Sequence, residues 1–193
     1  MQKSMAKKRD PIPSHAKCVF KGKIFEVWQW EQKLYDSSTK TFERLKRPDT
    51  VQVVTVVGDK ILILEETQPD KSTPFLTLPG GRVDPGEDPL TAAKRELHEE
   101  TGYSAQDWSL WLAHDPVGKI EWTIYTYIAR DSKKDAEPHL DGGERVTAQL
   151  VTFDEFLALS NDPRFYDPSL THEFVIAHYD PAYKETLRKL ILG

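Results

Sequence analysis

The alternation of apolar and polar residues predicts β-strands over most of the chain. Between residues 18 and 34, β-branched and aromatic side chains alternate with polar ones, and residues 41–47 continue the pattern after a polar turn. Two apolar runs, 50–57 and 60–65, flank the pair Gly58-Asp59, which predicts a hairpin. Further strands are expected at 75–78, 109–113, 120–129 and 145–151.

One stretch, Pro89 to Thr101, has the periodicity and the end signals of a helix. Asp88 suits the N-cap, proline fits the first turn, and Gly102 stands where a left-handed residue ends a helix. A capping-box pattern at 152–155 opens a short helix, and two more helices are expected at 169–178 and 181–192. The order of strands, helix, strands and helices predicts an α+β fold with a mixed sheet between helices.

Length and composition limit the class of protein. With 193 residues the chain suits one globular domain, and Cys18, its single cysteine, cannot pair within the chain. The longest apolar runs, 51–57 and 61–64, are far shorter than the roughly 20 residues that cross a bilayer. No signal-peptide core follows the basic start, so a cytoplasmic protein with no membrane partner is expected.

Charge is distributed unevenly. The formal net charge is −5, but residues 1–24 hold seven bases and one acid, a net +6, so the rest of the chain is strongly acidic. Residues 1–17 are interpreted as a flexible basic arm. Such an arm can contact nucleic acid, but a solvated terminus is the simpler interpretation, and nucleic-acid binding is not expected. The acidic body repels phosphate-rich ligands unless cations intervene.

Three carboxylates share one face of the helix at 89–101. At 100° per residue Glu96, Glu99 and Glu100 lie within one sector, where they repel one another and oppose the helix dipole. Oxygen ligands without histidine or cysteine suit hard divalent cations such as Mg²⁺ or Mn²⁺. The alternative is a solvated acidic face accompanied by Lys94 and Arg95. An apolar stripe beside this face is expected to pack on a sheet, and it consists of Leu90, Ala93 and Leu97.

The longer spacing around this helix resembles the Nudix hydrolase box, G-x5-E-x7-R-E-U-x-E-E-x-G-U, in which U is apolar. All seven fixed identities match within 23 residues of the chain. At average residue usage, a chance match of this kind in one chain has a probability well below about one in a million. Tyr103 departs mildly from the aliphatic residue usual at the last position. The seven matching positions are Gly81, Glu87, Arg95, Glu96, Glu99, Glu100 and Gly102.

The resemblance implies an αβα sandwich that holds metal against a diphosphate. The metal ligands it implies, for Mg²⁺ with Mn²⁺ able to substitute, are Glu96, Glu99, Glu100 and the backbone carbonyl of Gly80. Arg95 is expected to orient the glutamates through ion pairs. Supporting roles in the box fall to Gly81, Glu87 and Gly102.

The implied reaction is attack of water on phosphorus, which requires a general base. In some family members the base is a box glutamate, for which Glu99 is the candidate here. In the ADP-ribose branch it lies on a later acidic loop, here Asp141-Gly142-Gly143-Glu144. Glu144 is then the first candidate and Asp141 the second, against the alternative of an acidic turn without a role.

The chain resembles the ADP-ribose and nucleoside-diphosphate-sugar pyrophosphatases within this family. The resemblance rests on a β segment at 18–48 before a Nudix domain at 49–193, on 41–49, and on 115–118. In that branch the β segment is exchanged between subunits, which implies a homodimer. The substrate-binding candidates are Trp28, Trp30, Glu43, Arg47 and Arg82, although the two tryptophans are equally explained as core or interface residues.

The expected function is Mg²⁺-dependent cleavage of ADP-ribose or another nucleoside-diphosphate sugar into a nucleoside monophosphate and a sugar phosphate. Residues 66–69 lack the Gln-Tyr-Arg element of the ADP-ribose branch, and 76–77 lack its usual glutamate, so the substrate stays open. One alternative is a nucleoside triphosphate or dinucleoside polyphosphate pyrophosphatase. Another is a non-catalytic module that binds nucleotide or RNA, which the complete set of box glutamates disfavours.

Overall fold

A seven-stranded mixed sheet forms the centre of the protein in the computed structural model, which describes residues 10–140 and 145–193. The strand order is β13-β5-β4-β11-β9, with β6 paired to β5 and β7 paired to β4. Only β11 and β4 run parallel to each other within this sheet; its other pairs are antiparallel. The strands are β4 (Thr50–Val57), β5 (Lys60–Thr67), β6 (Phe75–Thr77), β7 (Gly80–Arg82), β9 (Asp107–His114), β11 (Ile124–Arg130) and β13 (Arg145–Val151).

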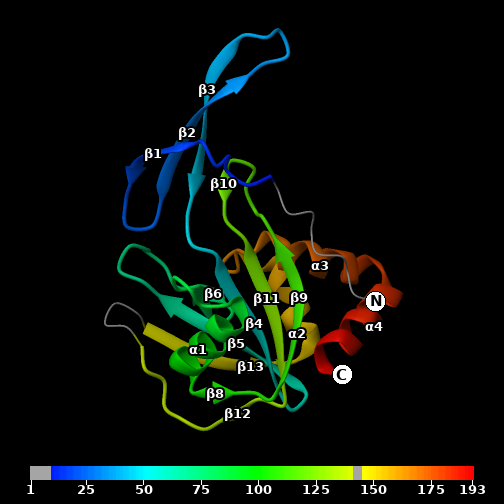
Figure 1. The fold of residues 1–193 in the computed structure, drawn as a ribbon. Coiled ribbons are helices and arrows are strands. Elements are labelled where there is room, and N and C mark those ends of the chain that lie inside the picture. Colours follow the sequence, from blue (N-terminus) through cyan, green and yellow to red (C-terminus); the bar gives the residue numbers. More distant parts are fainter. Residues whose placement is uncertain (1–9, 141–144) are drawn as a thin grey trace.

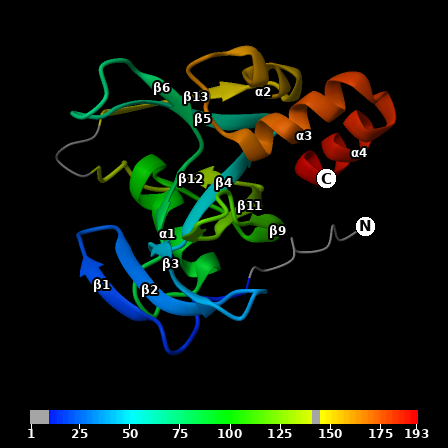
Figure 2. The ribbon, with the colours of Figure 1, turned by 90° about the horizontal axis from the view of Figure 1, so that it is seen from above.

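Helices cover both faces of this sheet (Figure 2). Alternate β4 residues face opposite sides: Val51 and Val53 pack against α1, whereas Val54 and Val56 join the core beneath the other helices. The predicted mixed sheet between helices is therefore confirmed. Among the described residues, no helix has both the length and the apolar character needed to cross a membrane. The helices are α1 (Pro89–Thr101), α2 (Phe153–Ala158), α3 (Pro168–Tyr179) and α4 (Pro181–Leu192), with a short 3₁₀ turn at Leu159–Asn161.

The predicted helix ends are confirmed. Asp88 accepts hydrogen bonds from the first amides of α1, and Gly102 follows the helix with a φ of 71°. A Cβ at Gly102 would overlap the carbonyl oxygen of Ala136, so the position requires glycine for space as well as for conformation. Thr152 and Glu155 form the predicted capping box of α2.

A second sheet, of which three strands precede the central sheet in the chain, projects beyond its end (Figure 1). Its order is β1-β2-β3-β10, and β10 lies parallel to β3. Its strands are β1 (Lys17–Lys21), β2 (Glu26–Lys33), β3 (Thr39–Lys46) and β10 (Ile120–Glu121). A small third sheet consists of β8 (Tyr103–Ser104) and β12 (Lys133–Lys134).

The single strand expected at 120–129 is wrong, because the chain divides there between two sheets. β10 joins the second sheet and β11 joins the central one, with Trp122 and Thr123 between them. The amide of Thr123 donates to Oδ1 of Asp49 at 2.8 Å, and the indole of Trp122 donates to the hydroxyl of Thr50 at 3.0 Å. These long-range hydrogen bonds attach the segment between β10 and β11 to the start of β4.

Candidate active site

The box begins on β7 and continues through a loop into α1. β7 pairs with β4 so that Gly80 lies opposite Gln52, and Gly81 lies opposite Val51. A Cβ at Gly81 would overlap the carboxylate of Glu96. Glycine at this position therefore lets the helix carboxylate approach the backbone of β7.

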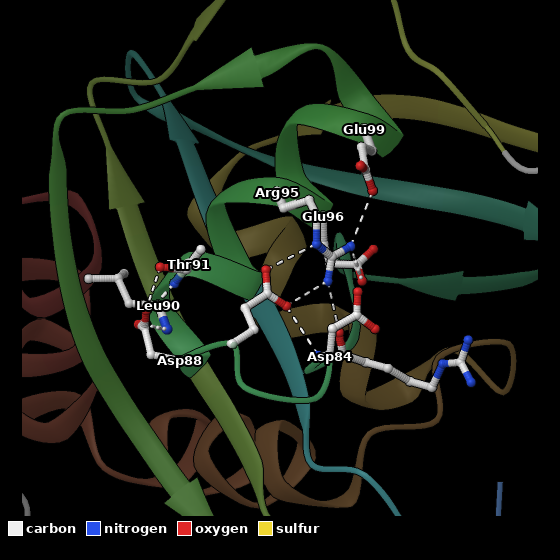
Figure 3. Close-up of polar contacts among 9 residues, drawn as sticks. Asp84, Asp88, Leu90, Thr91, Arg95, Glu96 and Glu99 are labelled. Atoms are coloured by element: carbon white, nitrogen blue, oxygen red, sulfur yellow. Dashed lines mark hydrogen bonds and ion pairs between the residues drawn. The ribbon is translucent and has the colours of Figure 1, made fainter.

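Arg95 binds three of the box glutamates (Figure 3). Its Nε and Nη2 donate to the two carboxylate oxygens of Glu87, at 3.1 and 3.0 Å. Its Nη1 donates to Glu96 at 2.9 Å and to Glu99 at 3.2 Å. Nη2 also donates to the carbonyl oxygen of Arg82, at 3.0 Å. The planar guanidinium can donate from three nitrogens to several acceptors at once, whereas lysine has a single nitrogen.

The pKa values of two of these glutamates, Glu87 and Glu96, shift in opposite directions. The hydrogen bonds from Arg95 hold the pKa of Glu87 below its ordinary value. Burial raises the pKa of Glu96, although Arg95 opposes the shift, and the charges of Glu99 and Asp84 raise it further. Figure 3 shows the Asp84 side chain near Arg95 and Glu96. The site thus carries more negative charge than its single arginine neutralises.

Glu100 connects the helix to β7. One of its carboxylate oxygens accepts a hydrogen bond from the amide of Gly80 at 2.9 Å. The last turn of α1 is thereby attached to the residue whose carbonyl is the expected backbone ligand. The structure thus brings Gly80 into contact with Glu100, and Glu96 lies beside the neighbouring Gly81.

The donor chemistry of this region fits a hard divalent cation. The candidate ligands are carboxylate and carbonyl oxygens, and the half-buried Glu96 lies beside like charges that a cation would offset. Within residues 10–140 and 145–193, however, no group of three or more His, Cys, Asp or Glu side chains stands ready to hold an ion. In this arrangement Arg95 engages Glu96 and Glu99, and the Gly80 amide engages Glu100.

A pocket of about 470 Å³ lies where the second sheet meets the central one, and its lining includes the basic side chains of Arg44, Lys46 and Arg47 and the acidic ones of Asp10, Asp49, Asp115 and Glu121. The guanidinium of Arg47 lies 4.3 Å from the ring centre of Trp122, and its Nε is buried without a hydrogen-bond partner among the described residues. Burial and the nearby charge of Arg82 lower the pKa of Arg47. Sequence reasoning missed Trp122, because its indole lies at the break inside an expected strand. Two adjacent arginines, one of them incompletely hydrogen-bonded, suit an anionic ligand.

The other predicted substrate residues lie on the second sheet, apart from α1 and β7 in the fold. Trp30 is only 8% exposed and packs against Phe42, with ring centres 6.1 Å apart. The indole of Trp28 donates to Glu26, and Glu43 accepts a hydrogen bond from Gln29. Within one copy of the chain, packing against Phe42 explains why Trp30 is buried.

The acidic loop with Glu144 and Asp141 lies outside the described residues. The segment before it is attached to the C-terminal end of α1: the amide of Asp135 donates to the backbone carbonyl of Gly102 at 2.9 Å, and the amide of His139 donates to the backbone carbonyl of Glu99 at 2.7 Å. β13 begins directly after the loop and pairs with β5. The chain therefore leaves the end of the box helix just before the loop.

Comparisons with known proteins agree with this geometry. The NUDIX domain model matches residues 46–172. The chain is 31% identical over 153 residues to the methanol dehydrogenase activator of Bacillus methanolicus, and 27% identical over 152 residues to an ADP-ribose pyrophosphatase of Bacillus subtilis (strain 168). Each alignment covers 77% of this chain and 82% of the relative.

Two further matches concern proteins that are named for ADP compounds. The ADP compounds hydrolase NudE of Escherichia coli (strain K12) is 28% identical over 109 residues, which cover 55% of this chain and 57% of that protein. A crystal structure of an ADP compounds hydrolase superposes with a TM-score of 0.71 at 21% identity, covering 90% of this chain and 95% of that one. At that identity the structural match supports the fold.

Proposed function

Because the chain belongs to the Nudix hydrolase family, we propose that it hydrolyses the diphosphate linkage of ADP-ribose or another nucleoside-diphosphate sugar. The products are a nucleoside monophosphate and a sugar phosphate. The observation that carries the proposal is the complete box, in which Arg95 binds Glu87, Glu96 and Glu99 beside β7. Similarity to proteins named for ADP-ribose or ADP compounds supports this substrate class over other diphosphates.

Nudix hydrolases generally use divalent metal cations, and we propose Mg²⁺ for this protein, with Mn²⁺ able to substitute. Glu96, Glu99, Glu100 and the carbonyl of Gly80 would hold it. A bound cation neutralises negative charge on the diphosphate oxygens. Arg95 keeps the carboxylates separated and oriented on one side of α1, so their mutual repulsion does not turn them away from β7.

The pair Arg47 and Arg82 suits the phosphates of the substrate. Arg47 and Arg82 lie near the first residue of β4, Thr50, which pairs with Arg82. The positive charge of Arg82 repels that of Arg47. A phosphate between them relieves this repulsion and gives the buried Nε of Arg47 an acceptor. Removal of the proton from water is assigned to Glu144, by resemblance, with Glu99 as the alternative base.

We further propose a homodimer in which the second sheet contributes to the partner's substrate site. Trp28, Trp30 and Glu43 would then reach substrate from the neighbouring copy. Exposed apolar side chains at the free edge of this sheet support an interface, since Val19 is 53% exposed and Phe20 is 60% exposed. Burying them against a second copy would stabilise the pair.

The test is release of nucleoside monophosphate from a substrate panel in the presence of Mg²⁺. The panel contains ADP-ribose, other nucleoside-diphosphate sugars, nucleoside triphosphates and dinucleoside polyphosphates. Cleavage of a diphosphate sugar is expected, with activity lost in Glu100→Gln and kept in Glu185→Gln, an exposed glutamate on α4. Preference for triphosphates would contradict the substrate class, and binding without cleavage would indicate a non-catalytic module.

A further inference from the structure

A large cavity lies between one end of the central sheet and α3, with a volume of about 1130 Å³. Its walls come from β9, from the segment after β9 and from the first turns of α3, with single residues from β4 and β11. Among its described lining residues, none belongs to α1 or to β7. The cavity is therefore separate from the box carboxylates.

The cavity extends along the free edge of the central sheet. β9 is the last strand of that sheet and, within the described part of the chain, pairs only with β11. Leu112 packs on the core beneath α3, whereas Leu110 pairs with Tyr127, which belongs to the core beneath α1. Both leucines line the cavity. The cavity therefore reaches around the edge of β9 from one face of the sheet to the other.

Such an edge suits an extended peptide segment. An edge strand presents a row of backbone N–H and C=O groups that can pair with another strand, and proteins usually cover or charge it. Apolar side chains lie beside this edge, since Leu110 is 42% exposed and Tyr166 is 89% exposed. A polar strand edge between apolar walls is the geometry by which sheets accept an added segment.

The walls of the cavity are acidic. Among the described lining residues there is neither lysine nor arginine, and the three carboxylates are Asp115, Asp167 and Glu173. The remaining basic side chains of the lining are two histidines, His114 and His172. Burial lowers the pKa of His114 below its ordinary value, so that its ring is neutral near pH 7. The cavity therefore attracts cationic side chains.

The described chain begins beside this cavity. The backbone carbonyl of Asp10 accepts a hydrogen bond from Nη1 of Arg44 at 2.6 Å. Asp10 also lines the pocket of about 470 Å³, which shares Trp122 and Asp115 with the cavity. Residues 1–9, which lie outside the described part of the chain, are therefore joined to the fold next to one end of the cavity.

Residues 1–9 complement the cavity in charge and in length. They include no acidic residue, and their four bases are Lys3, Lys7, Lys8 and Arg9. Nine extended residues span at most about 30 Å, and the eight residues of β9 span about 26 Å. The segment is thus long enough to follow the edge of β9 from the end at which it is joined.

We propose that residues 1–9 bind in this cavity of their own chain and cover the free edge of β9. The bases of the segment lie against the carboxylates of the cavity, and its backbone lies along the strand edge. In this arrangement the segment keeps the edge from pairing with strands of other molecules. The proposal does not depend on hydrolysis of a diphosphate, so it stands or falls separately from the proposed function.

The test measures in the full chain how close residues 1–9 lie to the cavity. Cys18, the single cysteine, is exposed and is replaced by serine, and Ser4→Cys then carries a nitroxide label. Paramagnetic broadening of backbone amide NMR signals reports the residues near the label. We expect broadening at 110–114 and 169–173, beside the cavity, and none at 145–151 on the opposite edge of the sheet.

Charge reversal of the segment provides the first variant. Lys7→Glu, Lys8→Glu and Arg9→Glu together should abolish the broadening, because the segment and the cavity walls then carry like charges. The matched control makes the same change of charge outside the cavity and should keep the broadening; it combines Lys33→Glu, Lys40→Glu and Lys133→Glu, all at exposed positions. The amide spectrum shows at the same time whether each variant keeps its fold.

Removal of charge from the cavity provides the second variant. Asp115→Asn with Asp167→Asn keeps oxygen acceptors for Thr123 and for the N-cap of α3 but removes two negative charges. The broadening should fall toward that of the control amides. It should also fall in the labelled parent between about 0.1 and 1 M salt, because the Debye length shortens from about 10 to 3 Å. Asp36→Asn with Asp59→Asn, in exposed turns, should leave it unchanged.

Three results would overturn the proposal. Broadening beside the cavity no stronger than at 145–151 would show that residues 1–9 stay in solvent. Broadening that survives both charge variants would show that charge complementarity does not hold the segment. In a mixture of isotope-labelled chains without nitroxide and unlabelled chains with it, broadening beside the cavity would show that the segment binds a second copy. A chain without hydrolytic activity leaves all these measurements valid.

Discussion

Arg95 shows at the scale of single residues how the box is assembled. One guanidinium contacts Glu87, Glu96 and Glu99, which lie on a loop and on successive turns of a helix. Its side chain is 29% exposed, whereas those of Glu87 and Glu96 are each 14% exposed. The partly buried bonds resist screening by salt better than those on an open surface. The same residue therefore offsets charge and fixes geometry.

Arg95→Lys is expected to lower kcat/KM by about 10- to 100-fold, as for residues that orient metal ligands. Lysine keeps the positive charge but cannot bind Glu87 with two nitrogens while also reaching Glu96. Steady-state kinetics and the concentration of Mg²⁺ at half-maximal rate would measure the change. The control is Arg188→Lys, which changes an arginine of α4 that pairs with Asp154. It should leave kcat/KM and the Mg²⁺ requirement unchanged. Equal activity in Arg95→Lys would show that charge alone suffices.

His114 makes stability depend on pH. Its folded-state pKa lies below the ordinary value, so between the two values the unfolded chain binds more protons than the folded one. Stability is therefore complete above about pH 6.5 and falls as the pH drops toward the folded-state pKa. Melting temperatures at pH 7.5 and 5.5 should differ more in wild type than in His114→Gln. A larger difference in the variant would contradict the sign.

Helix α1 shows at the scale of elements how packing and chemistry are divided. Ala93 and Leu97 of the predicted apolar stripe are buried against Val51 and Val53 of β4 together with Ala92, and Leu90 is partly buried there, while the carboxylates occupy the neighbouring face. Local end signals define the length of the helix, and burial of the stripe fixes its rotation. Rotation of the helix would carry the glutamates away from β7.

Leu97→Ala is expected to destabilise the fold by about 2–5 kcal/mol, the usual cost of truncating a fully buried leucine. Urea denaturation followed by tryptophan fluorescence would measure the free energy of unfolding. Leu190→Ala on α4, where the leucine is 38% exposed, provides the control and should cost much less. A loss in Leu97→Ala no larger than in the control would show that this face of α1 is not essential packing.

The whole molecule consists of a central sheet between helices and a second sheet at one end. β10 and β11 are consecutive along the chain but belong to different sheets, so the chain itself joins the two. Two pockets, of about 470 and 1130 Å³, lie near this junction and share Trp122 and Asp115. The second sheet thus borders the proposed substrate region, and its free edge carries exposed apolar side chains.

Light scattering is expected to give a dimer, about twice the 22.1 kDa of one chain. Phe20→Glu should shift the population toward monomer and lower activity, because a charge would interrupt the apolar edge of β1. Tyr179→Glu makes the same kind of change at an 81% exposed aromatic residue on α3 and should stay dimeric. A wild-type monomer with full activity would contradict the proposed exchange of the second sheet.

The box was predictable from sequence because its signals are local. Asp88, Pro89 and Gly102 define a 13-residue helix through contacts within a few positions of each end. The spacing of Arg95 and the glutamates follows helical geometry, which repeats regardless of the rest of the fold. The hairpin at Gly58 and the capping box at Thr152 were predictable for the same reason.

Tertiary structure decided what depends on residues far apart in the chain. The expected strand at 120–129 has continuous β propensity, and only bonds from Trp122 and Thr123 to residues more than 70 positions away divide it. The stacking of Arg47 on Trp122 likewise joins distant segments. The cavity under α3 exists because a helix and three strands meet there. Sequence alone determined the box helix, since short-range geometry specifies it, and the resemblance of the box to a known family indicated the class of chemistry, whereas the pockets beside the second sheet are formed only by long-range packing.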